Sequence, residues 1–152
     1  MYKRQLVSDA GTPGISDPGY RLIVEAIKKN IEIIPIPGPT ALITALCASG
    51  LPTDRFLFIG FPPRKKRALE ELLKSSKEEE GTLIFYQSAL RTPQFIQSIR
   101  EIFGNREIVV ARELTKIHEE FIRGKMDEVI KILGEKTLKG EVVILVKGKK
   151  EK

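Results

Sequence analysis

The sequence predicts an α/β protein, because short apolar runs alternate with segments of helical periodicity along the chain. In the first part, residues 6–8 and 31–36 (IEIIPI) are predicted strands, and each is followed by a Gly- and Pro-rich turn. An apolar pattern of helical period follows each turn, with Asp17 placed to cap the first helix and Thr40 the second, at residues 41–48. Strand, turn and helix at these lengths indicate a parallel sheet covered by helices.

The later part of the chain predicts a second α/β unit. We expect strands at residues 56–61, 82–86, 107–112, 120–124 and 141–146, and helices at residues 67–77, 92–103 and 126–134. The turn sequence LPTD begins at Leu51 and separates the two parts. We therefore divide the chain into a first domain at residues 1–52 and a second at residues 53–152.

Composition narrows the class of protein. The 152 residues suffice for one domain or two small ones, and 41% hydrophobic with 30% charged residues is ordinary for a globular chain. No apolar run approaches the roughly 20 residues of a membrane span, and no secretory signal is present, so we expect a cytoplasmic protein. The single cysteine, Cys47, excludes an internal disulfide, and its apolar neighbours predict a buried helix residue.

The net charge of +6 suggests a polyanionic partner, and the excess falls into two clusters. One is the basic cluster Arg64, Lys65, Lys66 and Arg67, introduced by the rigid sequence Phe61-Pro62-Pro63; the other is the tail Lys147, Lys149, Lys150 and Lys152. Either cluster is explained by ordinary solvated surface, and this explanation is stronger for the tail. The alternative is that the basic cluster contacts nucleic-acid phosphates.

The loop LVSDAGTPGISDPG, residues 6–19, is the first candidate binding element. Its glycines permit positive φ and close approach to a ligand, but their spacing fits neither G-x-x-x-x-G-K-[ST] nor G-x-G-x-x-G. A tight structural turn is the alternative. The second turn, PGPTA at residues 37–41, also follows a predicted strand, so both turns are expected to line one preformed pocket for a small polar molecule.

Four segments carry a family resemblance: LVSDAGTPGISDPG, IPIPGPTALITALCASGLPTDRFLFIGFPPRKK, LIFYQSALR and ARELTKIHEEFIRG. In this order they resemble the ribosomal RNA small subunit methyltransferase I family of the tetrapyrrole methylase superfamily. The resemblance implies two α/β domains with S-adenosylmethionine bound between them, a homodimer, and methylation of a ribose 2′-hydroxyl of a cytidine in 16S rRNA. The implied partners are 16S rRNA or the small ribosomal subunit.

The resemblance also implies a set of cofactor-binding residues, carried over by position. They come from the two turns and from two segments of the second domain: Asp9, Gly11, Thr12, Pro13, Gly14, Ser16, Pro37, Gly38, Thr40, Ala41, Tyr86, Gln87, Ala111, Arg112 and Glu113. The implied RNA-binding residues are Arg64, Lys65, Lys66 and Arg67. Methyl transfer to a hydroxyl needs alignment of the reactants and loss of a proton, and no metal.

No catalytic residue is assigned from the sequence. Asp17, Glu113, Lys116 and His118 are candidate bases by residue type alone. Each has a plainer explanation: helix cap for Asp17, an ion pair with Arg112 for Glu113, and exposed surface for Lys116 and His118.

Two departures from the family pattern affect what is expected of this chain. Family segments that precede the first loop, P-x-G-N-L and E-D-T-R, have no counterpart, so we expect an incomplete first domain in a chain cut at both ends. Where relatives have E-S-P-H-R, this chain has QSALR from Gln87. Two other functions stay open: methylation of a tetrapyrrole precursor, and RNA binding by a non-catalytic fragment, which would bind no cofactor.

Overall fold

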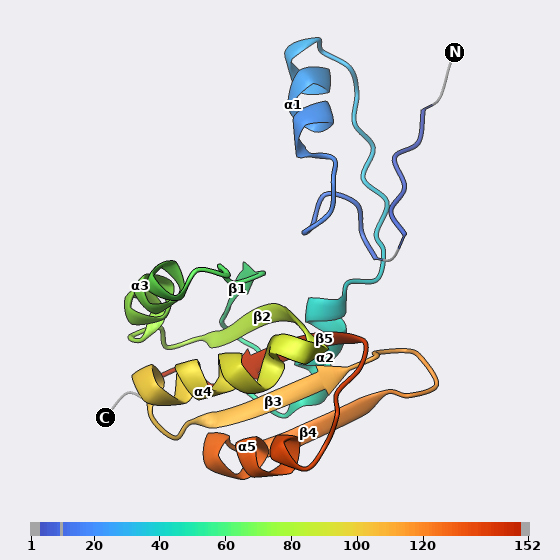
Figure 1. Cartoon of the computed structure of the whole chain (residues 1–152). Helices are drawn as coiled ribbons and strands as arrows, with labels where there is room; N and C mark the ends of the chain where they lie inside the picture. Colours follow the sequence, from blue (N-terminus) through green and yellow to red (C-terminus); the bar gives the residue numbers. More distant parts are fainter. Residues whose placement is uncertain (1–3, 10, 150–152) are drawn as a thin grey trace. The chain divides into compact units, whose positions relative to one another are not determined.

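The computed structural model describes residues 4–9 and 11–149 (Figure 1). By contacts between residues the chain divides into two compact units, Met1–Ala41 and Leu42–Lys152. None of the helices in the described ranges combines the length and the apolar character that a bilayer span requires.

The second unit is built on a five-stranded sheet with the order β1-β2-β5-β3-β4. Its strands are β1 (Phe56–Gly60), β2 (Thr82–Ser88), β3 (Glu107–Arg112), β4 (Glu120–Lys125) and β5 (Glu141–Val146). β1 and β2 are parallel, whereas β2, β5, β3 and β4 pair antiparallel. The sheet is therefore mixed, with β1 and β4 at its edges.

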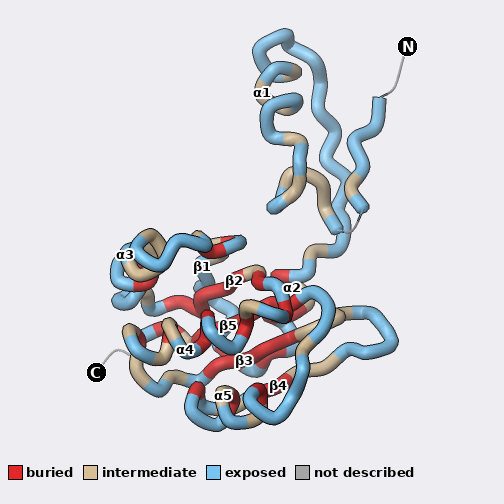
Figure 2. The backbone as a smooth tube through the Cα atoms, viewed as in Figure 1, coloured by how far each residue is buried: buried red, intermediate tan, exposed pale blue. Residues whose placement is uncertain are grey.

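Helices cover both faces of this sheet (Figure 1). One face packs against α3 (Lys66–Ser76), α4 (Thr92–Phe103) and α5 (Met126–Gly134), through a core that includes Phe85 and Ile144. The opposite face packs against α2 (Ala41–Ser49) through a smaller core that includes Ile84 and Leu145. Successive residues of a strand point to opposite faces, which explains why β2 and β5 each supply both cores. Figure 2 shows the central strands β2, β5 and β3 largely buried, whereas the edge strands β1 and β4 are mostly exposed or half-buried.

The predicted elements of the second unit are confirmed. α4, α5, β3 and β5 have the expected bounds, and the others differ by one or two residues at an end. Each of these segments has a buried apolar face, so periodicity identified it. A short 3-10 helix, η1 (Ala89–Arg91), was not expected.

The predicted strands of the first unit are wrong. The described residues of this unit form one helix, α1 (Tyr20–Lys28), and residues 6–8 and 31–36 are extended without a partner strand. A strand is defined by its ladder of hydrogen bonds, which alternation of side chains alone cannot supply. The apolar side chains of the second segment are accordingly exposed, with Ile34 at 73% and Ile36 at 74%.

Two local predictions on helices are also wrong. α1 has Gly19 as its N-cap without a side-chain cap hydrogen bond, so Asp17 does not cap it. Cys47 is exposed, because α2 buries the stripe Leu42, Ala45, Leu46 and Ser49, and Cys47 lies outside that stripe. By contacts α2 groups with the second unit almost entirely. The domain boundary after residue 52 stays a prediction.

Candidate cofactor and nucleic-acid sites

The two predicted turns of the first unit lie against each other. The Thr12 hydroxyl donates a hydrogen bond to the Pro39 carbonyl oxygen over 3.1 Å. A Cβ added at Gly38 would lie 3.2 Å from Thr12 Oγ1, and one added at Gly11 would lie 3.4 Å from the Pro39 oxygen. A side chain at Gly38 would therefore press on the Thr12 hydroxyl, whereas at Gly11 the Cβ itself makes an ordinary contact and the positive φ is what favours glycine.

The first turn is held in an unusual backbone conformation. Gly11 and Gly14 have φ values of +86° and +84°, and Ser16 has +58° although it carries a side chain. The Ser8 hydroxyl donates to the Gly11 carbonyl oxygen over 2.7 Å, which closes the turn. Left-handed non-glycine residues cost free energy and gather at functional sites, so Ser16 supports a ligand-binding interpretation of this loop.

In the second unit, the predicted residues of β2 and β3 divide between the two faces of the sheet. Tyr86 and Ala111 lie on the face that α2 covers. Gln87 and Arg112, one residue further along each strand, therefore point to the other face. Within each of the predicted pairs Tyr86-Gln87 and Ala111-Arg112, the two side chains therefore lie on opposite faces of the sheet.

The environments of Tyr86 and Gln87 differ accordingly. The Tyr86 hydroxyl accepts a hydrogen bond from the Leu42 backbone N–H over 3.1 Å at the start of α2. Gln87 is 3% exposed, its Oε1 accepts from the Ser88 N–H, and its buried Nε2 has no partner within the described residues. Tyr86 therefore fixes a helix start, and Gln87 is enclosed in the core.

Arg112 belongs to an ion-pair network at one end of the sheet. Its Nε lies 2.7 Å from Glu120 Oε2, and Lys136 Nζ lies 2.6 Å from Glu120 Oε1. An ion pair with Arg112 was the alternative explanation for Glu113, but the antiparallel register places Glu120 opposite Arg112, and Glu113 pairs with Lys116 instead. Arg112, Glu120 and Lys136 line a shallow hollow of about 410 Å³, together with His118, Glu119, Thr137 and Leu138. The two cations lower the pKa of Glu120, with Lys136 the larger cause.

The connection after β3 contains three of the candidate bases, Glu113, Lys116 and His118, and the first two are unsuited to the role. Glu113 has φ of +49°, and its carboxylate accepts from the Glu141 N–H over 3.0 Å, which lowers its pKa and weakens it as a base. Hydrogen bonds to Glu141 and Glu113 raise the pKa of Lys116, so it stays protonated at neutral pH. His118 is exposed, as expected. The proton acceptor stays unassigned.

Replacing Glu120 with Gln is expected to destabilise the second unit by about 1 kcal/mol at pH 7. The folded-state pKa of Glu120 lies below its ordinary 4.5, so its stabilisation is present above pH 4.5 and is lost as the pH falls through the lowered value. Urea denaturation at pH 7 and in acid checks this. Glu101→Gln, at an exposed α4 position without an ion pair among the described residues, is the control. Equal loss for Glu120→Gln at both pH values would contradict the electrostatic cause.

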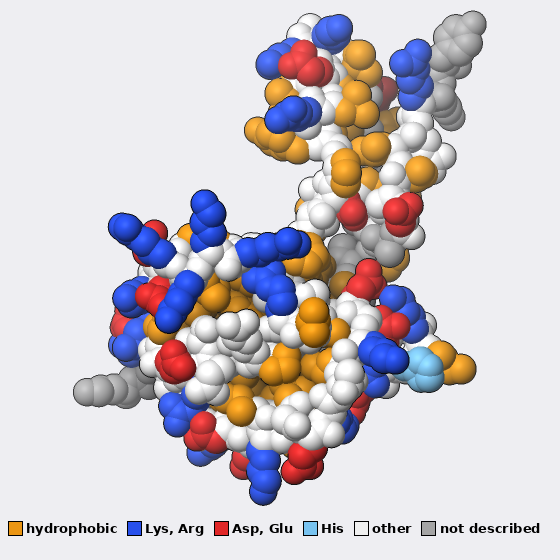
Figure 3. Space-filling view, in the orientation of Figure 1, with side chains coloured by type: hydrophobic (Ala, Val, Ile, Leu, Met, Phe, Trp, Pro, Cys, Tyr) orange, Lys and Arg blue, Asp and Glu red, His pale blue; other side chains and the backbone are white. Residues whose placement is uncertain are grey.

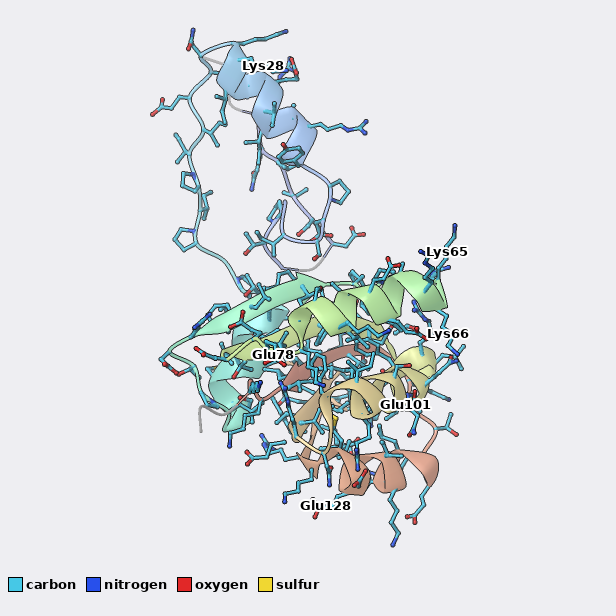
Figure 4. All side chains as sticks on the ribbon, turned by 90° about the vertical axis from the view of Figure 1, so that its left-hand side faces the viewer. Lys28, Lys65, Lys66, Glu78, Glu101 and Glu128 are labelled. Atoms are coloured by element: carbon cyan, nitrogen blue, oxygen red, sulfur yellow. The ribbon has the colours of Figure 1, made fainter. Side chains whose placement is uncertain are left out.

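The basic cluster, Arg64, Lys65, Lys66 and Arg67, lies where α3 begins. Figure 3 shows Lys and Arg side chains gathered over the α3 side of this unit, and Figure 4 shows Lys65 and Lys66 extending into solvent. Arg67 pairs with Glu71 over 2.9 Å and Lys66 with Glu70 over 4.0 Å. Within the residues that the structure describes, Arg64 and Lys65 form no ion pair, so two cations are available to an anion.

The position of this cluster is unfavourable for the helix itself. The first turn of α3 carries no acidic residue, and its N-cap, Lys65, makes no side-chain cap hydrogen bond. Cations at a helix N-terminus oppose the helix dipole, whereas phosphate groups are favoured there. The tail is different, since Lys147 pairs with Glu107 and Lys149 with Glu78. Lys150 and Lys152 lie outside the described residues.

Sequence reasoning missed Glu120 as the partner of Arg112, and Lys136 as the second cation that pairs with Glu120. The signal was present for Glu120, because neighbouring antiparallel strands at residues 107–112 and 120–124 bring their connected ends together. Lys136 lies in the turn before β5 and carries no periodic pattern, so nothing in the sequence predicted its position.

Comparison of the chain with models of known protein families identifies its family. The family model for tetrapyrrole (corrin/porphyrin) methylases matches residues 2–130. The chain belongs to this family. Its fold agrees, since the methyltransferase CobJ covers 91% of the chain with a TM-score of 0.67 at 22% identity. A uroporphyrin-III C-methyl transferase from Thermus thermophilus, solved with S-adenyl homocysteine, covers 90% with a TM-score of 0.60 at 16% identity.

Within this methylase family, the chain is similar to proteins named ribosomal RNA small subunit methyltransferase I. That of Halalkalibacterium halodurans is 51% identical over 97% of the chain, and that of Synechocystis is 49% identical over 94%. A Thermotoga maritima relative is 45% identical over 97% of the chain. The chain spans about half the length of the first two relatives and 66% of the third.

Proposed function

We propose that the chain is part of an S-adenosylmethionine-dependent methyltransferase that modifies a ribose 2′-hydroxyl of a cytidine in 16S rRNA. The observation that carries the proposal is the similarity, at 51% and 49% identity over nearly the whole chain, to methyltransferases named for small-subunit ribosomal RNA. We also propose a cytoplasmic homodimer that acts on 16S rRNA or the small ribosomal subunit. The parts 1–52 and 53–152 would belong to its two domains.

The paired turns are the proposed cofactor wall. A related uroporphyrin-III methyltransferase was solved with the demethylated cofactor, which supports S-adenosylmethionine as the methyl donor here. Gly11 and Gly38 support this proposal by letting the two turns lie against each other, because a Cβ at either position would contact the facing turn. Asp9, Pro13, Pro37 and the other predicted residues of both turns would complete this wall.

The cofactor supplies an activated methyl group, and the chain's own residues position the acceptor. Transfer to a hydroxyl oxygen is an in-line displacement, so alignment of the acceptor contributes most of what the protein must provide. The exposed basic cluster is the proposed contact to the RNA backbone. Tyr86 would have a positioning role, because its hydroxyl accepts a hydrogen bond from the backbone at the start of α2.

Methylation of a tetrapyrrole precursor is the second candidate, favoured by the fold similarity to a cobalt precorrin-4 methyltransferase with a TM-score of 0.64. Tetrapyrrole precursors carry several carboxylates, which the cations at the start of α3 would also attract, so it is the similarity to relatives named for ribosomal RNA that favours RNA. An RNA-binding fragment without catalysis is the third candidate, which the paired turns argue against.

The test is transfer of tritiated methyl from S-adenosylmethionine to a single-stranded fragment of 16S rRNA by this chain. We expect label in alkali-resistant dinucleotides, because a 2′-O-methyl group blocks alkaline cleavage of the adjacent phosphodiester. RNA with 2′-deoxycytidine at every cytidine is the control and should take up no label. Label on a base, or on uroporphyrinogen but not RNA, would refute the proposal, as would no transfer by this chain when it is joined to the parts of a relative that it does not span.

A further inference from the structure

We propose that Phe61 is a stacking residue that receives a nucleobase of the RNA substrate beside the basic cluster. The inference rests on the proposed function and adds a specific contact to it. Phosphate contacts are shared by every nucleotide, whereas an aromatic face selects unpaired bases and orients the strand that carries them.

The first observation is the exposure of the side chain. Phe61 directly follows edge strand β1, and 65% of its surface is exposed. The next residue, Pro62, is buried and Pro63 is half-buried, so the backbone is anchored immediately after the exposed ring. Proline also fixes φ, which limits the motion of this segment.

The second observation is that neighbouring rings hold Phe61 in place. Its ring lies edge-to-face with Tyr86, with centroids 5.5 Å apart and an interplanar angle of 64°. Tyr86 is itself packed against Phe58 at 4.9 Å and hydrogen-bonded to the Leu42 N–H. Because 65% of Phe61 is exposed, part of its ring stays accessible beside this edge-to-face contact. A ring held this way loses little freedom on binding.

The third observation is the charge beside the ring. Arg64 is three residues from Phe61, so its backbone lies within about 11 Å of it even if the segment is fully extended. Arg64 and Lys65 form no ion pair among the described residues. A base on Phe61 would therefore bring the phosphates of its own strand within reach of two available cations, which is the arrangement of single-strand binding surfaces.

Other exposed apolar residues of this unit do not combine an aromatic ring with neighbouring cations that lack an ion pair. Leu90 and Ile117 are 90% and 94% exposed, but an aliphatic side chain has no π face for a base. Phe56, at the opposite end of β1, is 41% exposed and follows Arg55, which is paired with Glu79 and Glu80. Phe56 is therefore a matched control on the same strand.

The sequence contains no tryptophan, so Phe61→Trp introduces a single fluorescent reporter at the proposed contact. We expect its emission to be quenched on titration with a cytidine-containing RNA of about 12 nucleotides, a length within the range of single-strand sites. A sugar-phosphate strand without bases should quench little, and Phe56→Trp should respond to neither. Phe61→Ala should weaken RNA binding about tenfold, with an unchanged salt slope and with unchanged S-adenosylmethionine binding.

The outcomes separate the inference from the proposed function. RNA binding that depends on the basic cluster, without quenching of the indole emission in the Phe61→Trp variant, would overturn the stacking role alone. No RNA binding by the unsubstituted chain would refute the proposed function and the inference with it. If the emission of the Phe61→Trp variant shifts with protein concentration in the absence of RNA, a second copy covers the ring, which also overturns the inference.

Discussion

Gly11→Val is expected to abolish S-adenosylmethionine binding by this chain, measured as loss of the heat of binding in calorimetric titration. A Cβ at position 11 would already be in van der Waals contact with the Pro39 carbonyl oxygen at 3.4 Å, so we expect the larger side chain of valine to press on the facing turn. It would separate the turns, whose side-chain link is the 3.1 Å bond from Thr12 to Pro39. The proposed cofactor wall requires that link.

The control for this variant is Gly104→Val. Gly104 has φ of +81°, close to the +86° of Gly11, but nothing lies within 4 Å of a Cβ built there. Both variants therefore share the backbone strain of a left-handed L-residue, of order 1–2 kcal/mol, and differ in what the new side chain meets. Cofactor affinity that falls equally in both would assign the loss to strain. Unchanged affinity in Gly11→Val would remove the first turn from the binding site.

The variant Gly38→Ala tests the steric contact between the two turns without the backbone strain that a positive φ would add. Gly38 does not occupy the left-handed region, and its new Cβ would lie 3.2 Å from Thr12 Oγ1, so the Thr12 hydroxyl that bonds to Pro39 must shift by a few tenths of an ångström. We expect weakened binding with the fold retained, which circular dichroism checks.

The sequence was a good guide where a segment buries one face. Residues of β3, such as Val109 and Val110, alternate between two cores, and the α4 residues Phe95, Ile96 and Ile99 line one of them. These patterns require only the local chain, and they predicted every α-helix and strand of the second unit, although not the short 3-10 helix η1. Residues 31–36 have an equally apolar pattern, but the structure gives them no partner strand among the described residues. Hydrophobicity predicts a tendency to pair, and the pairing depends on distant segments.

The candidate site was predicted less completely, for two physical reasons. The two turns meet through residues that are far apart in the sequence, Thr12 and Pro39. The Gly and Pro content that both turns share only suggested that they would meet. The positive φ of Ser16 and Glu113 has no signature in residue type. By contrast, the sequence was enough to predict that Tyr86 and Gln87 lie on opposite faces of the sheet, because adjacent residues of a strand point in opposite directions.

Replacing Arg64, Lys65, Lys66 and Arg67 together with Ser is expected to weaken binding of single-stranded RNA roughly 100-fold at physiological salt. Each cation that neutralises a phosphate on a single strand contributes about 0.7 to the slope of log affinity against log salt concentration, so four contribute roughly 3. Fluorescence anisotropy of labelled RNA across a salt series measures both quantities. The fold should be retained, because removing cations from a helix N-terminus relieves an unfavourable interaction with the dipole.

The ion pairs within the basic cluster determine how much each of its four cations contributes to the loss of RNA binding. Lys66 and Arg67 already interact with Glu70 and Glu71, whereas Arg64 and Lys65 form no ion pair among the described residues. The double variant Arg64→Ser, Lys65→Ser should therefore cause at least half of the change in slope. Its control is Lys131→Ser, Lys139→Ser, which removes the same charge from exposed positions. If both double variants lower the slope equally, net charge explains the binding; if only the first does, the start of α3 is the RNA contact.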